Sequence, residues 1–372
     1  MGRRVLITGG AGFIGSHVAD ELLANAYEVR ALDSLAIQVH GPLRGRPDYL
    51  DPNVELIVGD VRDPAMVRAA LDGVDDVLHF AAVVGVGQSM YQIEHYTSVN
   101  DVGTAVLLEA LNKNPVERLV VASSMSIYGE GLCRGPNGRT VTPRDRSLTQ
   151  LKAGQWELTD DDGNELTPHP TPESKEPSLA SVYALTKFDQ ERLCLMFGRA
   201  YGIDAVALRF FNVYGPRQAL SNPYTGVLAI FASRLLNGRA PLIFEDGNQK
   251  RDFVSVHDVA QACRLALEVK DAAGQVFNIG SGHDYTVREI AEKAADVLGV
   301  RDIEPEVTGK YRMGDIRHCY ADIERARRLL GYDPKMGLDE GLEELAGWLE
   351  GRVAEDYVEA ASEELAERGL TV

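Results

Sequence analysis

The sequence predicts an α/β fold in which a doubly wound parallel sheet carries a smaller α+β lobe. Short apolar runs without polar alternation take turns with segments of helical spacing up to residue 211, as strands buried on both faces require. The first of these runs leads into closely spaced glycines and then a helical segment. After residue 212 the strands become short and scattered between amphipathic helices, which is typical of an α+β unit.

The expected elements follow the chain in order. Strands are predicted at residues 5–8, 28–33, 54–61, 76–82, 118–124 and 205–211, and helices at 16–26, 64–71, 94–111 and 183–201. In the second lobe, helices are predicted at 226–236, 257–269, 286–298 and 322–330, and strands at 242–244, 276–279 and 303–307. The expected domains are therefore 1–211 with the sheet, 212–349 with a closing helix at 338–349, and an acidic helical tail at 350–372.

Residues 131–177 interrupt this alternation. The segment is rich in Gly, Pro, Thr and Asp and shows little periodicity, so we interpret it as an insertion into the first domain. Trp156 and Leu158 indicate that part of it packs against something. A lid, an interface and partial disorder all remain open for it.

Composition limits the partners. The net charge of −18 disfavours nucleic acids and anionic membranes, and an anionic substrate must meet a local group of arginines. No apolar run is long enough to span a bilayer, and the first strand begins too early for a signal peptide, so we expect a cytoplasmic protein. Four widely spaced cysteines without a CxxC motif predict neither a disulfide framework nor a metal site.

A strand, a glycine turn and a helix make up residues 3–26, which begin RRVLITGGAGFIG. Gly9 permits the tight turn, Gly12 lets the backbone approach a pyrophosphate, and Gly15 lets the helix pack on the strand. The second strand ends in Asp33, whose carboxylate suits both ribose hydroxyls and would repel a 2′-phosphate. The pattern predicts a bound dinucleotide, NAD rather than NADP.

Tyr183 and Lys187 lie four residues apart in SVYALTK, on one face of a predicted helix. A phenol with a pKa of about 10 is a poor base at neutral pH. A neighbouring ammonium and a positive nicotinamide ring are expected to lower the pKa of Tyr183. Ser124, at the end of a predicted strand, can hold a substrate oxygen beside it. Together these residues predict proton and hydride transfer.

Two arginines of the second lobe suit a diphosphate. Arg251 precedes a strand-like run, and Arg312 stands in a loop before a helix. Two guanidinium groups can clasp a pyrophosphate in bidentate fashion, although two solvated arginines would give the same pattern.

These motifs resemble those of the extended short-chain dehydrogenases/reductases, and among them the nucleotide-sugar epimerases and dehydratases. The same resemblance includes Gly59–Asp60, HFAA at 79–82 and RFFNVYGPR at 209–217. The resemblance runs from about residue 3 to 349 and implies a Rossmann domain. It implies that Ser124, Tyr183 and Lys187 are catalytic. It also implies the residues that line NAD: Gly9, Gly12, Phe13, Ile14, Gly15, Asp33, Asp60, Val61, Ala81, Ala82, Asn100 and Lys187. Family dimers pack the helices expected at 94–111 and 183–201, so a homodimer is expected.

The resemblance also narrows the reaction. Family 4,6-dehydratases carry an Asp-Glu pair where this chain has Met125 and Ser126. Decarboxylases usually have Glu, and 3,5-epimerases Cys, at the Ser126 position. The remaining reaction is epimerisation at C4 by transient oxidation. A 4,6-dehydratase, a ketone reductase that releases its cofactor, and a non-catalytic NAD-binding regulator are the alternatives.

Within the family, residues 83–92 and the insertion before residues 170–173 resemble the dTDP-L-rhamnose 4-epimerases. This implies a dTDP-6-deoxyhexose substrate, with UDP-glucose or UDP-glucuronate as the alternative. Met90 suits a methyl group better than a carboxylate. The expected substrate-binding residues are Gln88, Ser89, Ser124, Asn212, Arg217, Arg251 and Arg312.

Overall fold

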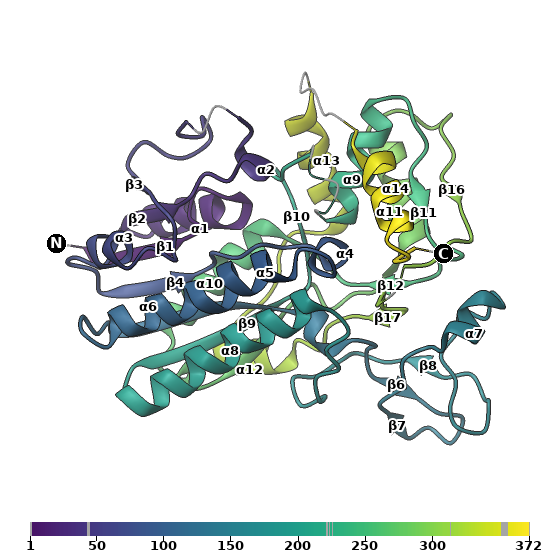
Figure 1. The fold of residues 1–372 in the computed structure, drawn as a ribbon, viewed down its shortest axis with the longest axis horizontal. Coiled ribbons are helices and arrows are strands. Elements are labelled where there is room, and N and C mark those ends of the chain that lie inside the picture. Colours follow the sequence, from purple (N-terminus) through teal and green to yellow (C-terminus); the bar gives the residue numbers. More distant parts are fainter. Residues whose placement is uncertain are drawn as a thin grey trace.

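A computed structural model describes residues 2–42, 45–220, 222, 224, 226–312, 314–350 and 356–371. Its centre is a seven-stranded parallel sheet in the order β14-β9-β5-β4-β1-β2-β3 (Figure 1). The strands are β1 (Arg4–Thr8), β2 (Glu28–Asp33), β3 (Glu55–Val58), β4 (Asp76–His79), β5 (Arg118–Ser124), β9 (Asp204–Phe210) and β14 (Val276–Ile279). This arrangement confirms the predicted doubly wound sheet.

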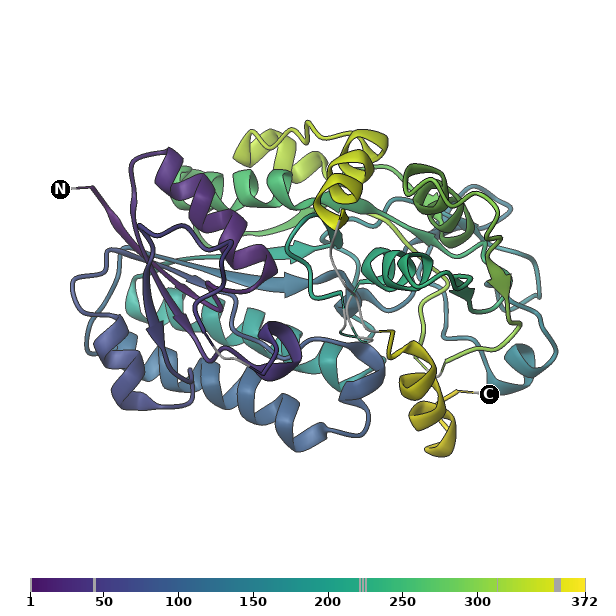
Figure 2. The ribbon, with the colours of Figure 1, turned by 90° about the horizontal axis from the view of Figure 1, so that it is seen from above.

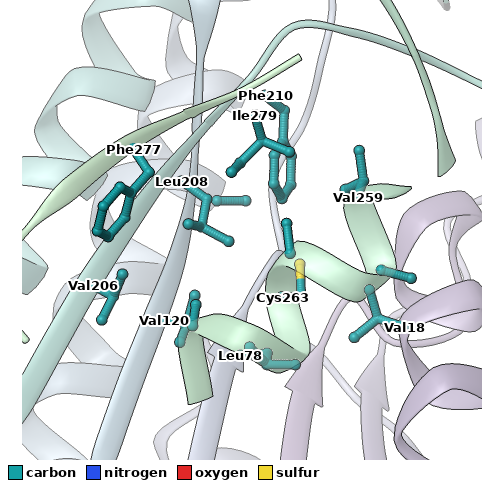
Figure 3. Close-up of a cluster of buried hydrophobic side chains, with 14 of the residues drawn as sticks. Val18, Leu78, Val120, Val206, Leu208, Phe210, Val259, Cys263, Phe277 and Ile279 are labelled. Carbon is teal, nitrogen blue, oxygen red and sulfur yellow. The ribbon is translucent and has the colours of Figure 1, made fainter. Parts of the chain in front are cut away.

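Helices cover both faces of the sheet (Figure 2). One face carries α1 (Phe13–Ala24), α10 (Val256–Glu268) and α12 (Glu324–Leu330), and the other α3 (Pro64–Ala70), α6 (Gly103–Leu111) and α8 (Val182–Tyr201). Alternate residues of β1 face opposite layers: Val5 and Ile7 join the core under α1 and α10, and Leu6 joins the core under α3 and α6. Figure 3 shows the first of these cores. Burial on both faces explains why the strands are apolar throughout.

The helix predicted at 94–111 is three segments joined end to end. It consists of α5 (Ile93–Tyr96), a π-helical segment (Thr97–Val102) and α6. Apolar spacing alone does not reveal the wider π turn, which contains Asn100.

The strand predicted at 276–279 forms, but it belongs to the central sheet and not to the second lobe in which it was predicted. β14 pairs in parallel with β9, with Val276 opposite Ala207, and so extends the central sheet. α10 packs against α1 on that sheet. The chain therefore returns to the first domain after residue 211. The sequence did not predict this, because an apolar four-residue strand carries no signal of which sheet it joins.

Apart from α10, β14 and α12, which pack with the central sheet, residues 212–349 form the second lobe. Its helices α9 (Val227–Leu236), α11 (Val287–Val297) and α13 (Leu338–Leu349) share one hydrophobic core. Its strands are β10 (Asn212–Tyr214), β11 (Leu242–Ile243), β12 (Lys250–Arg251), β13 (Phe253–Ser255), β15 (Tyr285–Thr286), β16 (Glu306–Val307) and β17 (His318–Cys319). The short 3-10 turn Lys270–Ala272 instead joins α10 to β14.

The insertion folds around a three-stranded antiparallel sheet of β6 (Cys133–Arg134), β7 (Thr140–Val141) and β8 (Thr167–Pro168), with the short helix α7 (Leu148–Lys152). Cys133, Leu158 and Leu166 form its small core. Trp156 packs against Tyr311 of the second lobe, with ring centroids 6.3 Å apart.

Of the predicted tail at 350–372, the structure describes residues 350 and 356–371, and the second range contains helix α14 (Val358–Glu367). In both views this helix lies away from the central sheet (Figures 1 and 2). Among the helices of the described residues, none is long and apolar enough to cross a membrane.

Candidate active site

A cavity of about 990 Å³ runs along the carboxyl ends of the sheet strands and beneath the second lobe. Ligands of doubly wound sheets bind at this edge. Most of the predicted site residues line it: Gly9, Gly12, Phe13, Ile14, Gly15, Asp33, Asp60, Val61, Ala81, Ala82, Ser124, Tyr183, Lys187, Asn212, Arg251 and Arg312.

The glycine turn has the tight geometry that its sequence predicts. Gly9 adopts φ +73°, which favours glycine. A Cβ on Gly15 would lie 2.3 Å from the carbonyl oxygen of Gly9, so the helix could not approach the turn with any larger residue. α1 begins after Gly12 without a side-chain cap, and its first amides are free to bind phosphate oxygens. The turn fits the pyrophosphate of a dinucleotide.

Asp33 ends β2 at the edge of the same cavity. Its Oδ2 accepts from the amide of Ala11 at 3.0 Å, and its Oδ1 accepts from the amide of Leu35 at 2.9 Å. These bonds fix the carboxylate where a ribose would reach it. Asp60, farther along the cavity, forms an ion pair of 2.6 Å with Arg62.

Tyr183 stands in the first turn of α8, which is capped by Ser181. Burial raises the pKa of Tyr183, and its hydrogen bond with Ser124 opposes that rise. The net direction is opposite to the predicted lowering. Ser124 also hydrogen-bonds the hydroxyl of Ser126 at 2.5 Å, so the two serines and the tyrosine form one hydroxyl cluster.

Lys187 follows one turn later and is buried. Its ammonium donates to Oε1 of Gln190, and burial lowers its pKa to about 8. The amide nitrogen of Gln190 lies 2.9 Å from Oγ1 of Thr104, which in turn lies 2.8 Å from Nε2 of His79. Gln190 was not predicted, although its spacing of three residues from Lys187 is a usable helical signal.

Two predicted sugar contacts, Gln88 and Ser89, do not line the cavity. Both lie in the short helix α4 (Val86–Ser89) and are buried. Oγ of Ser89 donates to the carbonyl of Val86 at 2.6 Å and accepts from the amide of Tyr183 at 3.0 Å. Oε1 of Gln88 accepts from the hydroxyl of Tyr96 at 3.2 Å. The segment is correctly placed, but Gly87 and Met90 line the cavity instead, because the helical turn points the polar side chains inward.

Asn100 and Arg217 are likewise not part of the cavity lining. Asn100 binds both backbone groups of Val83, at 2.8 and 3.1 Å, and so shapes the wall from behind. Arg217 adopts φ +68° and pairs with Asp20 at 2.7 Å. That partner turns Arg217 away from the diphosphate for which it was predicted.

Arg251 and Arg312 of the second lobe both line the cavity. Arg312 forms an ion pair of 3.0 Å with Asp315 and lies over the ring of Phe244, 4.6 Å from its centroid. Oδ1 of Asn212, which is buried, has no hydrogen-bond partner among the described residues and can accept a donor from a ligand.

The C-terminal helix supplies a wall that sequence reasoning missed. Ala361 and Leu365 of α14 line the cavity. A Cβ on Gly87 would touch Leu365 at 3.4 Å, so α14 packs on α4 beside the start of α8. Glu364 secures this position by accepting from the hydroxyl of Tyr91 at 3.1 Å. The amphipathic spacing of the tail was its only signal.

The sequence matches the family described as the NAD dependent epimerase/dehydratase family over residues 5–152 and 158–280. It is 37% identical to a dTDP-L-rhamnose 4-epimerase of Burkholderia thailandensis, over 94% of this chain and 95% of the relative. It is 32% identical to the UDP-glucose 4-epimerase of Thermotoga maritima solved with UDP-glucose, with a TM-score of 0.76 over 93% of this chain and 98% of that one.

A third similar protein is the UDP-glucuronic acid 4-epimerase of Bacillus cereus, solved with UDP-glucuronic acid and NAD. It is 28% identical, with a TM-score of 0.75 over 93% of this chain and 98% of that one. The family match covers most of the chain and confirms the resemblance and the cofactor that the glycine turn predicts. The chain belongs to the NAD dependent epimerase/dehydratase family, and its cofactor is NAD.

Proposed function

We propose that this chain, an NAD-dependent nucleotide-sugar 4-epimerase, acts on a dTDP-6-deoxyhexose such as dTDP-L-rhamnose. The observation that carries the proposal is the shared cavity. The dinucleotide turn, the Ser124–Tyr183 pair and the two arginines at its far end open onto the same space. A diphosphate held by Arg251 and Arg312 would bring an attached sugar toward Tyr183.

The reaction needs one base and one hydride acceptor. Tyr183, as phenolate, removes the proton from O4 while the C4–H bond breaks and its electron pair leaves as hydride. Ser124 holds that oxygen by a hydrogen bond. The residues of the glycine turn and Asp33 would hold NAD, which would supply the hydride acceptor and donor and a positive ring that favours the phenolate of Tyr183. The 4-keto sugar turns over in the cavity, and Tyr183 returns the proton to O4 as C4 regains hydride on its other face.

The carboxylates of the cavity argue against dehydration. Among its described lining residues they are Asp33, Asp60 and Asp315. The first two stand at the dinucleotide end, and Asp315 is paired with Arg312. Elimination of water needs an acid and a base beside the sugar. The position next to Ser124 offers only the hydroxyl of Ser126, so epimerisation is favoured.

The wall near Tyr183 favours a methyl group on the sugar. Gly87, Met90 and Leu365 form this part of the lining. A carboxylate buried there would need a cation. Of the lysines and arginines in the described lining, Arg62 pairs with Asp60 and Lys187 binds Gln190, and we assign the other two, Arg251 and Arg312, to the diphosphate. UDP-glucose and UDP-glucuronate stay as alternatives, since similar structures hold those ligands.

A substrate panel tests the proposal. dTDP-L-rhamnose, UDP-glucose and UDP-glucuronate are each incubated with the enzyme, and NMR reads the configuration at C4. We expect dTDP-L-rhamnose to give the 4-epimer with the highest kcat/KM. A UDP-sugar turned over faster would contradict the substrate. Tyr183→Phe is expected to lower kcat by about 10²–10⁴-fold and to leave NAD bound.

We also propose a homodimer that packs the outer faces of α6 and α8. Leu185, Met196 and Tyr201 of α8 are exposed large apolar residues on that helix. Light scattering should give twice the chain mass, and Leu185→Glu should shift it toward the monomer. The domain division and the cytoplasmic location remain predictions: residues 1–211 with α10, β14 and α12 form the NAD-binding domain, and the rest of 212–349 holds the nucleotide sugar.

A further inference from the structure

The two arginines assigned to the diphosphate are both held by one short stretch of chain, residues 315–317. The guanidinium of Arg251 donates to the carbonyl of Arg317 at 3.0 Å and to the carbonyl of Ile316. Arg312 is held by the carboxylate of Asp315 at 3.0 Å. A shift of this stretch would therefore move both guanidinium groups together.

Side chains from the insertion and from the residue before it hold the same stretch. Arg146 donates to the carbonyl of Asp315 at 3.1 Å. Glu130 accepts from the amides of Arg317 at 2.7 Å and of His318 at 3.2 Å. Arg146 is itself fixed by an ion pair of 2.8 Å with Glu245 of the second lobe.

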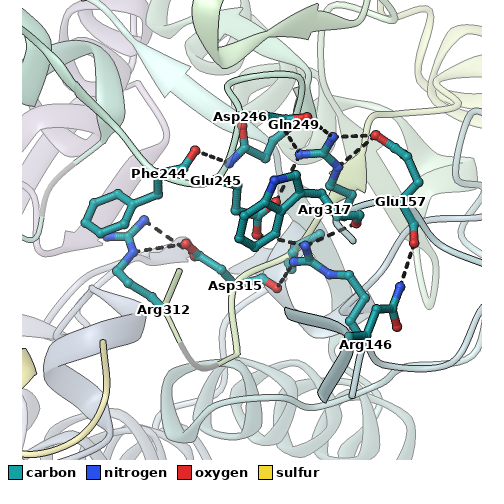
Figure 4. Close-up of polar contacts among 12 residues, drawn as sticks. Arg146, Glu157, Phe244, Glu245, Asp246, Gln249, Arg312, Asp315 and Arg317 are labelled. Atoms are coloured by element: carbon teal, nitrogen blue, oxygen red, sulfur yellow. Dashed lines mark hydrogen bonds and ion pairs between the residues drawn. The ribbon is translucent and has the colours of Figure 1, made fainter. Parts of the chain in front are cut away.

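The side chain of Arg317 anchors the stretch from the other side (Figure 4). It is fully buried and lies among three carboxylates: Glu157 of the insertion, Glu245 at 3.0 Å and Asp246 at 2.6 Å. Glu157 also pairs with His318 at 2.9 Å. Burial would raise the pKa of Glu157, but the hydrogen bonds from His318 and Arg317 outweigh it and lower that pKa to about 2. Glu157 is therefore charged at neutral pH.

A buried charge cluster is weak evidence for stability, because desolvation offsets much of the attraction between its ions. The cluster mainly fixes the positions of its side chains, since a buried charge is stable only while it stays paired. A pyrophosphate needs two guanidinium groups at fixed separation, and groups held in advance lose less entropy on binding. The cluster meets that need beside the cavity without lining it: neither Arg146 nor Glu157 is part of the lining.

We propose that Arg146 and Glu157 of the insertion are positioning residues for the nucleoside-diphosphate end of the substrate. They hold residues 315–318 and, through them, Arg251 and Arg312. This inference rests on the proposed function, because it takes a diphosphate as the ligand of those two arginines. It gives the insertion a role in substrate binding rather than in catalysis or in NAD binding.

The test compares Glu157→Gln and Arg146→Lys with Asp161→Asn in the holoenzyme. Gln keeps the shape of Glu157 but removes its charge. Lys keeps the charge of Arg146 but lacks the planar guanidinium, which donates hydrogen bonds from several nitrogens. Asp161→Asn is the matched control, because Asp161 pairs with Arg144 on the exposed surface of the same insertion. Titration calorimetry measures the affinity for dTDP and for UDP, kinetics measures KM and kcat, and absorbance measures the bound NAD.

We expect both test variants to bind dTDP and UDP roughly ten- to a hundredfold more weakly, because small displacements of binding groups have effects of this size. KM for the sugar nucleotide should rise in parallel, while kcat at saturation and NAD content stay near those of the control. Unchanged affinity for both diphosphates would overturn the proposal. So would a parallel loss of NAD and of cooperative unfolding, which marks a merely structural role.

Arg251→Lys and Arg312→Lys separate this inference from the proposed function. If they leave dTDP and UDP affinity unchanged, the diphosphate assignment itself is wrong, and the proposed function loses its anchor. If they weaken binding but Glu157→Gln and Arg146→Lys do not, the positioning role alone is wrong.

Discussion

Ser89 Oγ accepts a hydrogen bond of 3.0 Å from the backbone amide of Tyr183. The loop after β4 thereby fixes the first turn of the helix that carries the phenol. The same hydroxyl donates to the carbonyl of Val86, which joins the cavity wall to that turn. Ser89 thus acts on the site through Tyr183, although the sequence predicted a direct contact with the sugar.

Ser89→Ala should lower kcat about fivefold and leave KM nearly unchanged. One buried hydrogen bond contributes about 1 kcal/mol, and its loss frees the turn that orients the phenol. Steady-state kinetics with a saturating sugar nucleotide measures the effect. Thr97→Ala, which removes a hydroxyl bonded to the carbonyl of Ile93, is the matched control. A larger effect on KM than on kcat would favour a direct sugar contact for Ser89.

The buried ammonium of Lys187 should make stability depend on pH. Burial lowers its pKa from 10.5 to about 8, so the folded chain binds fewer protons than the unfolded chain between these pH values. The burial cost is present below pH 8, at about 3 kcal/mol, and is relieved as pH rises toward 10.5. Lys187→Met, measured without dinucleotide, should therefore be more stable than the wild type at pH 7, and the gap should narrow at higher pH. A gap that is constant with pH would refute this.

Gly15→Ala should abolish NAD binding and destabilise the fold, because its Cβ would lie 2.3 Å from a backbone oxygen. Gly347→Ala is the matched control. Gly347 also lies in a helix, α13, but nothing stands within 4 Å of its added Cβ. That control should gain about 0.5–1 kcal/mol of stability from helix propensity. Thermal unfolding and the absorbance of bound NAD measure both variants, and equal behaviour would contradict the packing argument.

Leu365→Asp should raise KM for a 6-deoxy sugar nucleotide more than tenfold, because a buried unpaired charge in an apolar wall costs several kcal/mol. Ala366→Asp adds the same charge to the next residue of α14, which is exposed, and should change KM little. If the two variants behave alike, α14 does not form the wall of the sugar compartment.

Patterns that act over a few residues predicted most of the fold and site. The glycine turn, Asp33 and the Tyr183–Lys187 spacing are local, and the structure brings all of them to one cavity. The lobe of β14 was predicted wrongly, because its place in the sheet depends on a contact between residues far apart in the chain, with Val276 opposite Ala207. No local pattern encodes that pairing.

The remaining errors in the predicted site have the same physical reason. A side chain on a short helical turn points inward or outward according to packing that the sequence does not show, as Gln88 and Ser89 illustrate. A lowered pKa of Tyr183 was predicted from a neighbouring ammonium together with the nicotinamide ring. In the chain alone burial raises that pKa, and the ammonium of Lys187 binds Gln190. Predicting the wall formed by α14 would have required knowing where the C-terminal tail packs.

In the proposed reaction, one phenol removes and returns the proton on O4, and one dinucleotide removes and returns hydride at C4 of the same sugar. A substrate carrying deuterium at C4 tests it most directly, with NMR of the product. Retention of the label at C4 in the inverted configuration, with no label in free NADH or water, is the predicted result. Loss of the label together with a 6-deoxy-4-keto product would contradict the account.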